Sequence, residues 1–160
     1  MEEYLIAKYG NRVRVRVCGI FVKNNSLLLV KHTGLGDRGV FWAPPGGEVE
    51  FGESIKLNLQ REMLEETGLE VEVGEFICTH EFLKPPLHAI ELFFHIKLAK
   101  GKVITGIDPE LTTSEQIIKE VRYVTFEELE IIPNEQKHHL LQNVCGVEDF
   151  FNISSFVEKN

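Results

Sequence analysis

One segment, GGEVEFGESIKLNLQREMLEETGL from Gly46 to Leu69, constrains the fold of this chain more than any other. It begins directly after two prolines, and this run of proline and glycine predicts a tight loop with exposed backbone. Ser54 is suited to be the N-cap of a helix, and Gly68 is suited to end that helix in the left-handed conformation. The apolar residues of the predicted helix that would face a core are Ile55, Leu59 and Met63. The segment therefore predicts a loop that leads directly into an amphipathic helix.

Three carboxylates of this predicted helix share one face. Glu62, Glu65 and Glu66 stand at positions i, i+3 and i+4, where like charges repel one another weakly. A divalent cation reverses that cost, because hard cations prefer carboxylate oxygens that lie close together. Magnesium uses few carboxylates and leaves its other positions to water and substrate phosphates, so the spacing predicts a magnesium site for phosphate chemistry. A solvated acidic helix would explain the same spacing.

The whole pattern is more specific than the three carboxylates. Its positions are Gly47, Glu53, Arg61, Glu62, Met63, Glu65, Glu66, Gly68 and Leu69. Together they resemble the signature of the Nudix hydrolases, and the sequence from Trp42 to Gly47 is similar to the lead-in that often precedes it. Asn58 departs from the family pattern, which commonly has a small apolar residue there. The resemblance implies a single domain over residues 1–160 with an α+β Nudix fold, a mixed β-sheet sandwiched between α-helices.

The resemblance also implies a reaction, the hydrolysis of a phosphoanhydride in a nucleoside diphosphate linked to another moiety. Divalent ions that bridge phosphate oxygens neutralise their charge and acidify a bound water. We expect Mg²⁺, with Mn²⁺ as a substitute, held by the Gly46 carbonyl and by Glu62, Glu65 and Glu66. As further catalytic residues, Glu53 would position the water or support the site, and Arg61 would orient a glutamate. Arg61 and Glu53 are also expected to form an ion pair that steadies the loop against the helix. The general base could be Glu65, Glu66 or a loop glutamate.

Four residues outside the segment are candidate substrate contacts. Lys31, at the end of a predicted strand, resembles a position where family members often keep a basic residue near the substrate phosphates, and Trp42 lies in the lead-in. Glu81 and Phe82, near the end of another predicted strand, are further candidates, although an ordinary sheet face would explain both. These four positions are therefore predicted to lie around the substrate.

A long connection over residues 99–116 could supply one more acid. Loops of this length in a compact domain tend to be functional or disordered. Glu110 and Glu115 lie here, and family members often contribute an additional glutamate from this region as a metal ligand or base. For either residue alone, a solvated loop glutamate is the simpler interpretation.

Three functions remain open at this point. Pro85 lies at a place that resembles the pattern of ADP-ribose pyrophosphatases, which favours ADP-ribose or a nucleotide sugar as the substrate. The alternative is a house-cleaning pyrophosphohydrolase for oxidised or non-standard nucleoside triphosphates. The third is a non-catalytic nucleotide-sensing module, which would be expected to have lost signature carboxylates or to carry a DNA-binding extension. This sequence shows neither feature.

The composition of the chain limits the classes of molecule that it could bind and the compartment in which it could act. The net charge of −8, with much of the imbalance between Glu48 and Glu75, argues against binding to duplex nucleic acid and favours a small-molecule nucleotide bridged by metal. Cys18, Cys78 and Cys145 are scattered and lack CxxC spacing, which is typical of free thiols in a reducing compartment. No apolar run reaches membrane-spanning length, and the start of the chain is unlike a signal peptide. We therefore expect a cytoplasmic protein.

The remaining elements are predicted from periodicity and turn residues. Alternation over residues 11–21 predicts a strand, which would form a hairpin with Leu27–Val30 and line up Arg12, Arg14 and Arg16 on one face. Those arginines could meet an anionic substrate or a second subunit, or form an exposed edge face. Further predicted features are a bulge or turn at Gly74, a turn at residues 84–86, strands at 69–82, 88–98 and 117–124, a helix cap at Thr125 and a second helix from Asn134 to about Gln142.

The carboxyl end of the chain contains a pair of adjacent histidines and a tail rich in phenylalanine. His138 and His139 are adjacent and would point to different faces, so they make a poor metal pair and are expected at the surface. The tail over residues 146–160 contains three phenylalanines and is predicted to pack on the domain or on a partner subunit of a homodimer.

Overall fold

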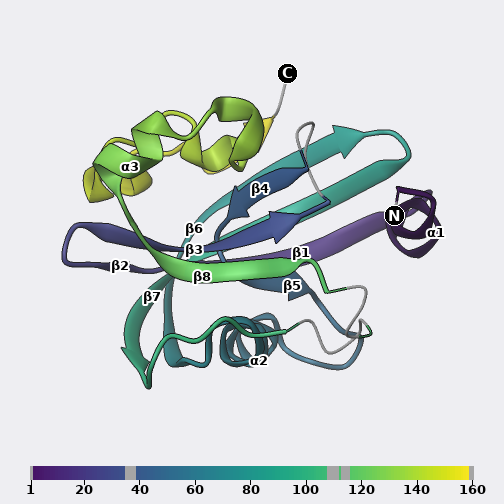
Figure 1. Ribbon diagram of the computed structural model, residues 1–160. Coiled ribbons are helices and arrows are strands. Elements are labelled where there is room, and N and C mark those ends of the chain that lie inside the picture. The colour runs from purple at the N-terminus through teal and green to yellow at the C-terminus, as the bar shows by residue number, and fades with distance from the viewer. Residues whose placement is uncertain (1, 35–38, 108–111, 113–115, 159–160) are drawn as a thin grey trace.

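Two β-sheets form the centre of the protein, and helices lie on both sides of them. Figure 1 shows the computed structural model, which describes residues 2–34, 39–107, 112 and 116–158. The helices are α1 (Glu2–Tyr9), α2 (Ile55–Thr67) and α3 (Phe126–Ile131), with 3₁₀ helices η1 (Asn134–Gln136), η2 (His139–Leu141) and η3 (Val147–Phe151). The strands are β1 (Val13–Ile20), β2 (Val22–Lys23), β3 (Ser26–Thr33), β4 (Val40–Ala43), β5 (Gly46–Glu48), β6 (Glu70–Lys84), β7 (Leu87–Lys100), β8 (Ile118–Thr125) and β9 (Phe156–Glu158).

The strands are divided between a five-stranded and a four-stranded sheet. The first has the order β5-β1-β7-β6-β9, with β1 parallel to β7 and antiparallel to β5. In the second, β3 pairs antiparallel with β2, β4 and β8. In Figure 1, α2 lies below the sheets, and α3 lies above them with the neighbouring 3₁₀ segments. The predicted α+β architecture, mixed sheet between helices, is confirmed, with the strands in two sheets.

The predicted hairpin between residues 11–21 and Leu27–Val30 is wrong in its pairing. The first strand, β1, pairs with β5 and β7 in the other sheet, so it lies inside that sheet and not at an exposed edge. The hairpin partner of β3 is the short strand β2. Asn24 and Asn25 at the turn have positive φ angles of 49° and 57°, which a type I′ turn requires and which asparagine tolerates. The chain does turn between residues 21 and 27, but the strand directly before this turn is β2, which lies in the other sheet from β1.

Apolar residues fill the space on both faces of the sheets. On β3, Leu27 and Leu29 point into a cluster beneath α3, whereas Leu28 and Val30 point into a second cluster with Leu59 and Met63 of α2. A strand that is buried on both faces has no polar side, which explains the continuous apolar run in this part of the sequence. The sheets therefore hold α2 against one core and the carboxyl end of the chain against the other.

The ends of α2 agree with the predicted caps. The Ser54 hydroxyl accepts a hydrogen bond from the Leu57 N–H, and Gly68 adopts a left-handed φ of 73° and donates to the Leu64 carbonyl. Leu59 and Met63 are fully buried as expected, but Ile55 is partly exposed and does not belong to either core cluster. The helix is thus anchored along its middle and positions its first turn near the surface.

A connecting segment covers the carboxyl end of α2. Ile104 N–H donates to the Thr67 carbonyl, and Gly106 N–H donates to the Glu66 carbonyl. A side chain at Gly106 would collide with the backbone carbonyl of Glu65, so this close approach requires glycine. The predicted bulge in β6 is confirmed, because the pairing with β7 shifts between Val73 and Phe76.

The predicted helix from Asn134 to Gln142 is wrong. The chain forms η1 and η2 with an extended stretch between them, in which His138 N–H donates to the Trp42 carbonyl of β4. Pairing with a neighbouring strand replaces the intrahelical hydrogen bonds here, so tertiary contact overrides the helical pattern. His138 is consequently buried, which contradicts its expected position at the surface.

The end of the chain contacts the domain. Phe150 of η3 is 1% exposed and belongs to the core cluster beneath α3, and β9 pairs parallel with β6 at Thr79 to Glu81. Thr125 caps α3 as predicted, in a capping box with Glu128. Of the described helices, none is long and apolar enough to cross a membrane.

Candidate active site

The double-glycine loop and α2 bring two of the predicted ligand carboxylates against bare backbone. Gly46 N–H donates to Glu66 Oε2 over 2.9 Å. The Glu62 carboxylate lies so close to Gly47 that any side chain there would collide with it. Gly46 itself has a φ of 149°, and a Cβ there would collide with the Val17 carbonyl of β1. Both glycines are therefore required by close packing of the loop between β1 and α2.

Arg61 connects the carboxylates on the exposed side of the helix. Its Nη1 lies 3.1 Å from Glu62 Oε1 and 3.2 Å from Glu65 Oε2, and its Nε donates to Glu53 Oε2 over 3.2 Å. The structure thus forms the contact between Arg61 and Glu53 that the sequence suggested. It also places Glu53, Glu62 and Glu65 around one guanidinium, so the local acidic charge is only partly balanced.

Asn58 explains the departure from the family pattern. Its side chain is completely buried, and its Oδ1 accepts hydrogen bonds from Glu50 N–H at 2.9 Å and from Arg61 Nη2 at 3.0 Å. The amide therefore ties the loop that follows the double glycine to the helix. A small apolar residue could not accept these two bonds.

The electrostatics of Glu62 suit a neighbouring cation. Burial raises the pKa of Glu62 to about 7, and the charge of Glu65 adds to this effect, whereas Arg61 and Arg16 lower it. A carboxylate with a raised pKa is destabilised in its ionised form by its surroundings. A divalent cation beside Glu62 and Glu66 would provide the opposite charge, and hard cations prefer such oxygen donors. The donor set therefore fits the predicted magnesium or manganese ion.

Arg16 reaches the same loop from β1, and the sequence did not identify it as part of the site. Its Nη2 donates to the Gly46 carbonyl over 3.3 Å, and its Nη1 donates to Glu91 Oε1 over 2.9 Å. The alternation of arginine and valine predicted that these arginines share one face of the strand. It could not predict their acidic partners, which are distant in the sequence. Arg12 and Arg14 both pair with Glu48, which follows the double glycine.

The predicted substrate contacts lie on two different sheets. Lys31 and Trp42 are register partners on β3 and β4, with Lys31 Nζ 5.4 Å from the centre of the Trp42 ring and 3.7 Å from Glu120 Oε2. Trp42 is only 5% exposed, which leaves little of its ring for a ligand. Glu81 lies on β6 and pairs with His88 of β7 at 2.9 Å, and Phe82 is the next residue of that hairpin.

Glu110 and Glu115, the two candidates for an additional acid, lie outside the residues that the structure describes.

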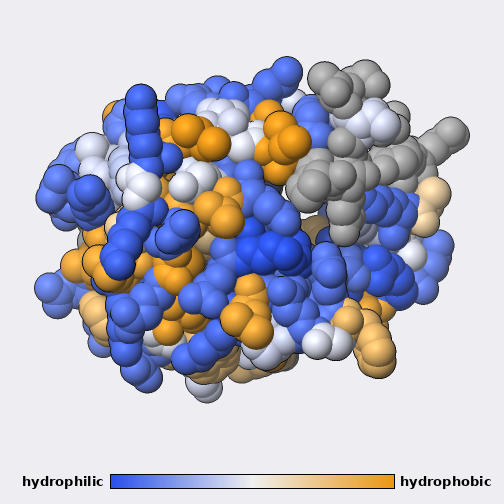
Figure 2. All heavy atoms as spheres, turned by 90° about the horizontal axis from the view of Figure 1, so that it is seen from below, coloured by the Kyte–Doolittle hydropathy of each residue, from blue (hydrophilic) through white to orange (hydrophobic). Residues whose placement is uncertain are grey.

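Two surface pockets flank the loop and helix. One, of about 360 Å³, is lined by Glu48, Val49, Glu50 and Phe51 after the double glycine, and by Lys8, Tyr9 and Arg12 from the amino end. The other, of about 510 Å³, lies beside Arg61 and Leu64 of α2. Figure 2 shows the molecule from below, the side on which α2 lies in Figure 1, and this face is mostly hydrophilic with separate hydrophobic groups. Neither pocket is lined by Glu62, Glu65 or Glu66, but Arg61, which contacts Glu62 and Glu65, lines the second one.

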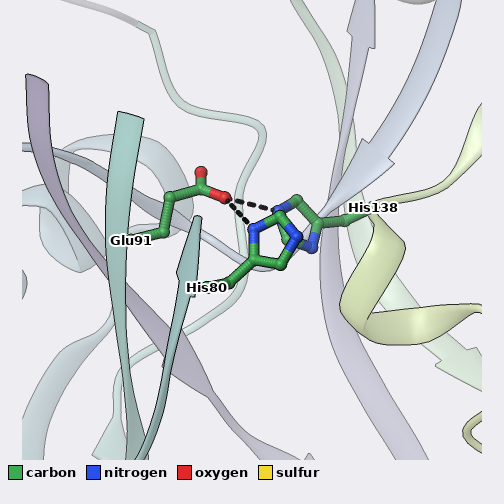
Figure 3. A group of neighbouring side chains, drawn as sticks. All are labelled: His80, Glu91 and His138. Atoms are coloured by element: carbon green, nitrogen blue, oxygen red, sulfur yellow. Dashed lines mark hydrogen bonds and ion pairs between the residues drawn. The ribbon is translucent and has the colours of Figure 1, made fainter. Parts of the chain in front are cut away.

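A second polar cluster lies inside the fold and was missed entirely. Figure 3 shows His80 of β6, Glu91 of β7 and His138 meeting at one carboxylate oxygen. His80 Nδ1 lies 2.9 Å from Glu91 Oε2, and His138 Nε2 lies 2.8 Å from the same oxygen. All three residues are buried. The predicted turn at residues 84–86 makes His80 and Glu91 partners on neighbouring strands, as they are in β6 and β7. No local signal in the sequence brings His138 to them.

Comparison with known proteins agrees with this geometry. A family model described as the NUDIX domain matches residues 10–143. The chain is 35% identical over 96 residues to an ADP-ribose pyrophosphatase of Methanocaldococcus jannaschii, covering 59% of this chain and 56% of that one. It is 35% identical over 65 residues to a CTP pyrophosphohydrolase of Escherichia coli, covering 41% of this chain and 48% of that one. The chain thus spans about half the length of these curated relatives.

Solved structures show the same fold. A NUDIX hydrolase from Nitrosomonas europaea has a TM-score of 0.66 at 22% identity, over 88% of this chain and 90% of that one. A MutT protein from Methanosarcina mazei has a TM-score of 0.64 at 21% identity, over 89% of this chain and 92% of that one. The match of the NUDIX domain model over most of the chain, and the α+β fold shared with these structures, place the protein in the Nudix hydrolase family.

Proposed function

We propose that the chain is a magnesium-dependent pyrophosphohydrolase that cleaves the phosphoanhydride of a nucleoside diphosphate linked to another moiety, such as ADP-ribose or a nucleotide sugar. The observation that carries this proposal is the packing of Glu62 and Glu66 against the double-glycine loop, with Glu65 held beside them by Arg61. Carboxylates that lie this close repel one another, and a divalent cation bound by their oxygens would offset that repulsion. The names of two relatives, both pyrophosphohydrolases or pyrophosphatases of nucleotides, support the same reaction class.

The residues divide the work according to their positions. Glu62, Glu65, Glu66 and the Gly46 carbonyl would hold Mg²⁺, with Mn²⁺ as a substitute, and the ion would neutralise phosphate oxygens and acidify a bound water. Arg61 keeps Glu62 and Glu65 oriented through its hydrogen bonds. Glu53 fixes Arg61 from the loop side and supports the site in this way. The general base would be Glu65, Glu66 or a loop glutamate.

Around this centre, Lys31, Trp42, Glu81 and Phe82 remain proposed substrate contacts. The net charge of −8 supports a small-molecule nucleotide as the partner and argues against duplex nucleic acid. A homodimer also remains a proposal. The 360 Å³ pocket beside Glu48 offers room for the part of a nucleotide that lies beyond its phosphates.

A second candidate is hydrolysis of nucleoside triphosphates. It is favoured by the match to the CTP pyrophosphohydrolase of Escherichia coli. The two functions differ in their phosphate product, because a triphosphate yields pyrophosphate and a nucleotide sugar yields a sugar phosphate. A non-catalytic sensing module is disfavoured, since Glu62, Glu65 and Glu66 are all present beside the loop.

The experiment is a panel of nucleoside diphosphate compounds and nucleoside triphosphates, incubated with the purified protein and Mg²⁺, with both products identified. We expect nucleoside monophosphate plus a phosphorylated second moiety from the preferred substrate. Glu65→Gln should lower kcat by more than about 100-fold, which exceeds the usual effect of a residue that only supports a ligand. Glu75→Gln, an exposed change on β6, is the matched control and should retain full activity. Wild-type turnover by Glu65→Gln at saturating Mg²⁺ would remove Glu65 from the ligand set.

A further inference from the structure

The Glu91 carboxylate accepts hydrogen bonds from three side chains inside the fold. Its Oε1 accepts from Arg16 Nη1 at 2.9 Å, and its Oε2 receives both His80 and His138 (Figure 3). Glu91 is only 3% exposed. Although burial alone would raise it, His138, His80 and Arg16 hold the pKa of Glu91 well below its usual value. Glu91 is therefore an ionised group with its oxygens fully engaged.

The hydrogen bonds of His138 define which of its nitrogens carries the proton. Leu140 N–H donates to His138 Nδ1 over 3.1 Å, so that nitrogen is an acceptor. The other nitrogen, Nε2, then carries hydrogen and donates to Glu91. His80 likewise donates from Nδ1, because an ionised carboxylate can only accept. Two imidazoles thus hold the carboxylate from one side while Arg16 holds it from the other.

This arrangement is unsuited to a metal ion, although the ligand atoms of His80, Glu91 and His138 all lie within 4.8 Å of one another. A histidine that binds metal through one nitrogen usually donates the hydrogen of the other to an acceptor. In His138 the other nitrogen faces the Leu140 N–H donor, so a metal at Nε2 would place two hydrogens against each other. The charge of Glu91 is also already balanced by Arg16. The cluster therefore acts as an anchor for Arg16.

Arg16 connects this anchor to the candidate metal site. Its Nη2 donates to the Gly46 carbonyl, and the N–H of the same glycine donates to Glu66. A backbone carbonyl oxygen has two lone pairs, so the Gly46 oxygen can accept from Arg16 and still be a ligand of the proposed cation. Arg16 also lies within electrostatic range of Glu66 and Glu62. Among the described residues, the buried Nε of Arg16 has no hydrogen-bond partner, so the guanidinium has a donor to spare. Without Glu91, the charges that still attract Arg16 would include two of the proposed metal ligands, Glu66 and Glu62.

We propose that Glu91 is a positioning residue of the metal site: it holds Arg16 on the Gly46 carbonyl and away from the Glu62 and Glu66 carboxylates. This inference rests on the proposed function, because it takes those carboxylates as metal ligands. A guanidinium paired with Glu62 or Glu66 would occupy the same oxygens as the cation, since arginine binds carboxylates through two parallel hydrogen bonds. Glu91 acts through Arg16 and touches neither substrate nor metal.

The test measures Mn²⁺ binding by electron paramagnetic resonance, which requires no turnover. The proteins are the wild type, Glu91→Gln, Arg16→Met and the double variant. We expect Glu91→Gln to raise the Kd for Mn²⁺ by about 10-fold, the size of effect typical of residues that support a ligand. The double variant should bind Mn²⁺ more tightly than Glu91→Gln alone, because no guanidinium remains to compete. A merely structural role of Glu91 would not be rescued by removing the side chain of Arg16 as well.

Controls separate this effect from loss of stability. Phe150→Leu lies in the core cluster that also contains Leu140 and Leu141, and it should lower the thermal stability without changing the Kd for Mn²⁺. Circular dichroism establishes that each variant is folded at the temperature of measurement. If Glu91→Gln does not fold, Glu91→Asp keeps the charge but withdraws it from Arg16. Its Kd should also rise, and an unchanged Kd would overturn the proposal.

The outcomes distinguish this inference from the proposed function. If the wild type binds Mn²⁺, Glu65→Gln does not, and Glu91→Gln binds as the wild type does, only the role of Glu91 is overturned. The same holds if the double variant binds as weakly as Glu91→Gln. If the wild type binds no Mn²⁺, the proposed function fails and this inference fails with it. If the purified protein carries stoichiometric zinc that His80→Ala loses, the cluster is a metal site and the anchor is refuted.

Discussion

The carboxylate of Glu62 lies against the backbone of Gly47 in the space that any side chain at position 47 would occupy. This contact sets the distance between the loop and α2. The glycine is therefore required by the position of Glu62, since the loop needs a residue without Cβ here. The contact is sensitive to a single methyl group.

We predict that Gly47→Ala abolishes most of the activity with a small effect on folding. The new Cβ would collide with the end of a flexible glutamate side chain, so Glu62 moves and the backbone remains. We expect kcat to fall by more than about 10-fold and the Kd for Mn²⁺ to rise. Steady-state kinetics and Mn²⁺ titration test this expectation. Gly146→Ala is the matched control, because a Cβ there meets no atom within 4 Å. Full activity in Gly47→Ala would show that Glu62 is not needed where it lies.

A second prediction concerns the pH dependence of stability without divalent cations. The folded-state pKa of Glu62 is raised to about 7 from 4.5, so ionisation of Glu62 opposes folding. Between these two values the folded state binds the extra proton, and the free energy of unfolding falls as the pH rises. Glu62→Gln lacks this penalty and should be more stable than the wild type by about 1–3 kcal/mol at pH 8. The difference should disappear below about pH 4.5.

Urea unfolding in EDTA at several pH values measures this difference. Glu75→Gln, which changes an exposed carboxylate, corrects for the loss of one charge. A wild type that is more stable than Glu62→Gln at pH 8 in EDTA would show that the ionised carboxylate is already well compensated by Arg61. Saturating Mg²⁺ should reverse the order, because only the wild type then gains a full set of ligands.

Chelation provides a third prediction. EDTA should abolish hydrolysis, and either Mg²⁺ or Mn²⁺ should restore it. A cation that binds only the folded state at 100 times its Kd adds about 2.7 kcal/mol to the free energy of unfolding. We therefore expect Mg²⁺ to raise the melting temperature of the wild type and to have little effect on Glu66→Gln. An equal rise in both proteins would place the bound cation elsewhere.

The fourth prediction concerns Asn58. Asn58→Ala removes the acceptor for Glu50 N–H and Arg61 Nη2, but it also removes a buried Nδ2 that has no hydrogen-bond partner among the described residues. Because these effects partly offset each other, we expect a loss of only about 1 kcal/mol in the free energy of unfolding. The activity should fall moderately, since Arg61 becomes less well held. Chemical denaturation and kinetics measure both effects, and a loss comparable to that of Glu65→Gln would give Asn58 a larger role.

The local geometry of the site could be predicted from the sequence. The ends of α2 at Ser54 and Gly68 and the contact between Arg61 and Glu53 agree with the prediction. The helical repeat and the caps involve neighbours within a few turns, so spacing alone determines which side chains meet. The bulge near Gly74 and the cap at Thr125 were predictable for the same reason.

Other features were decided by contacts between distant parts of the chain. The predicted helix from Asn134 failed because His138 N–H pairs with the carbonyl of Trp42, a strand residue that the local pattern does not report. The predicted hairpin failed because β1 pairs with β7, whose residues lie far along the chain. Hydrogen-bonding groups are identical along every backbone, so the choice of pairing partner depends on the assembled core.

The amino-acid sequence alone predicts a double-glycine loop and, after it, a helix with three acids on one face. Both features follow from local backbone geometry. The hydrogen bond from Arg16 to the Gly46 carbonyl, and the hydrogen bonds that hold Glu91, become apparent only in the folded protein. Glu91 is held by Arg16, His80 and His138. Those contacts join residues 30, 75, 11 and 47 positions apart, and their combined geometry exists only after the two sheets and the carboxyl end have packed together. The proposed metal-binding face thus follows from local spacing in the sequence, whereas the contacts that support it depend on the tertiary fold.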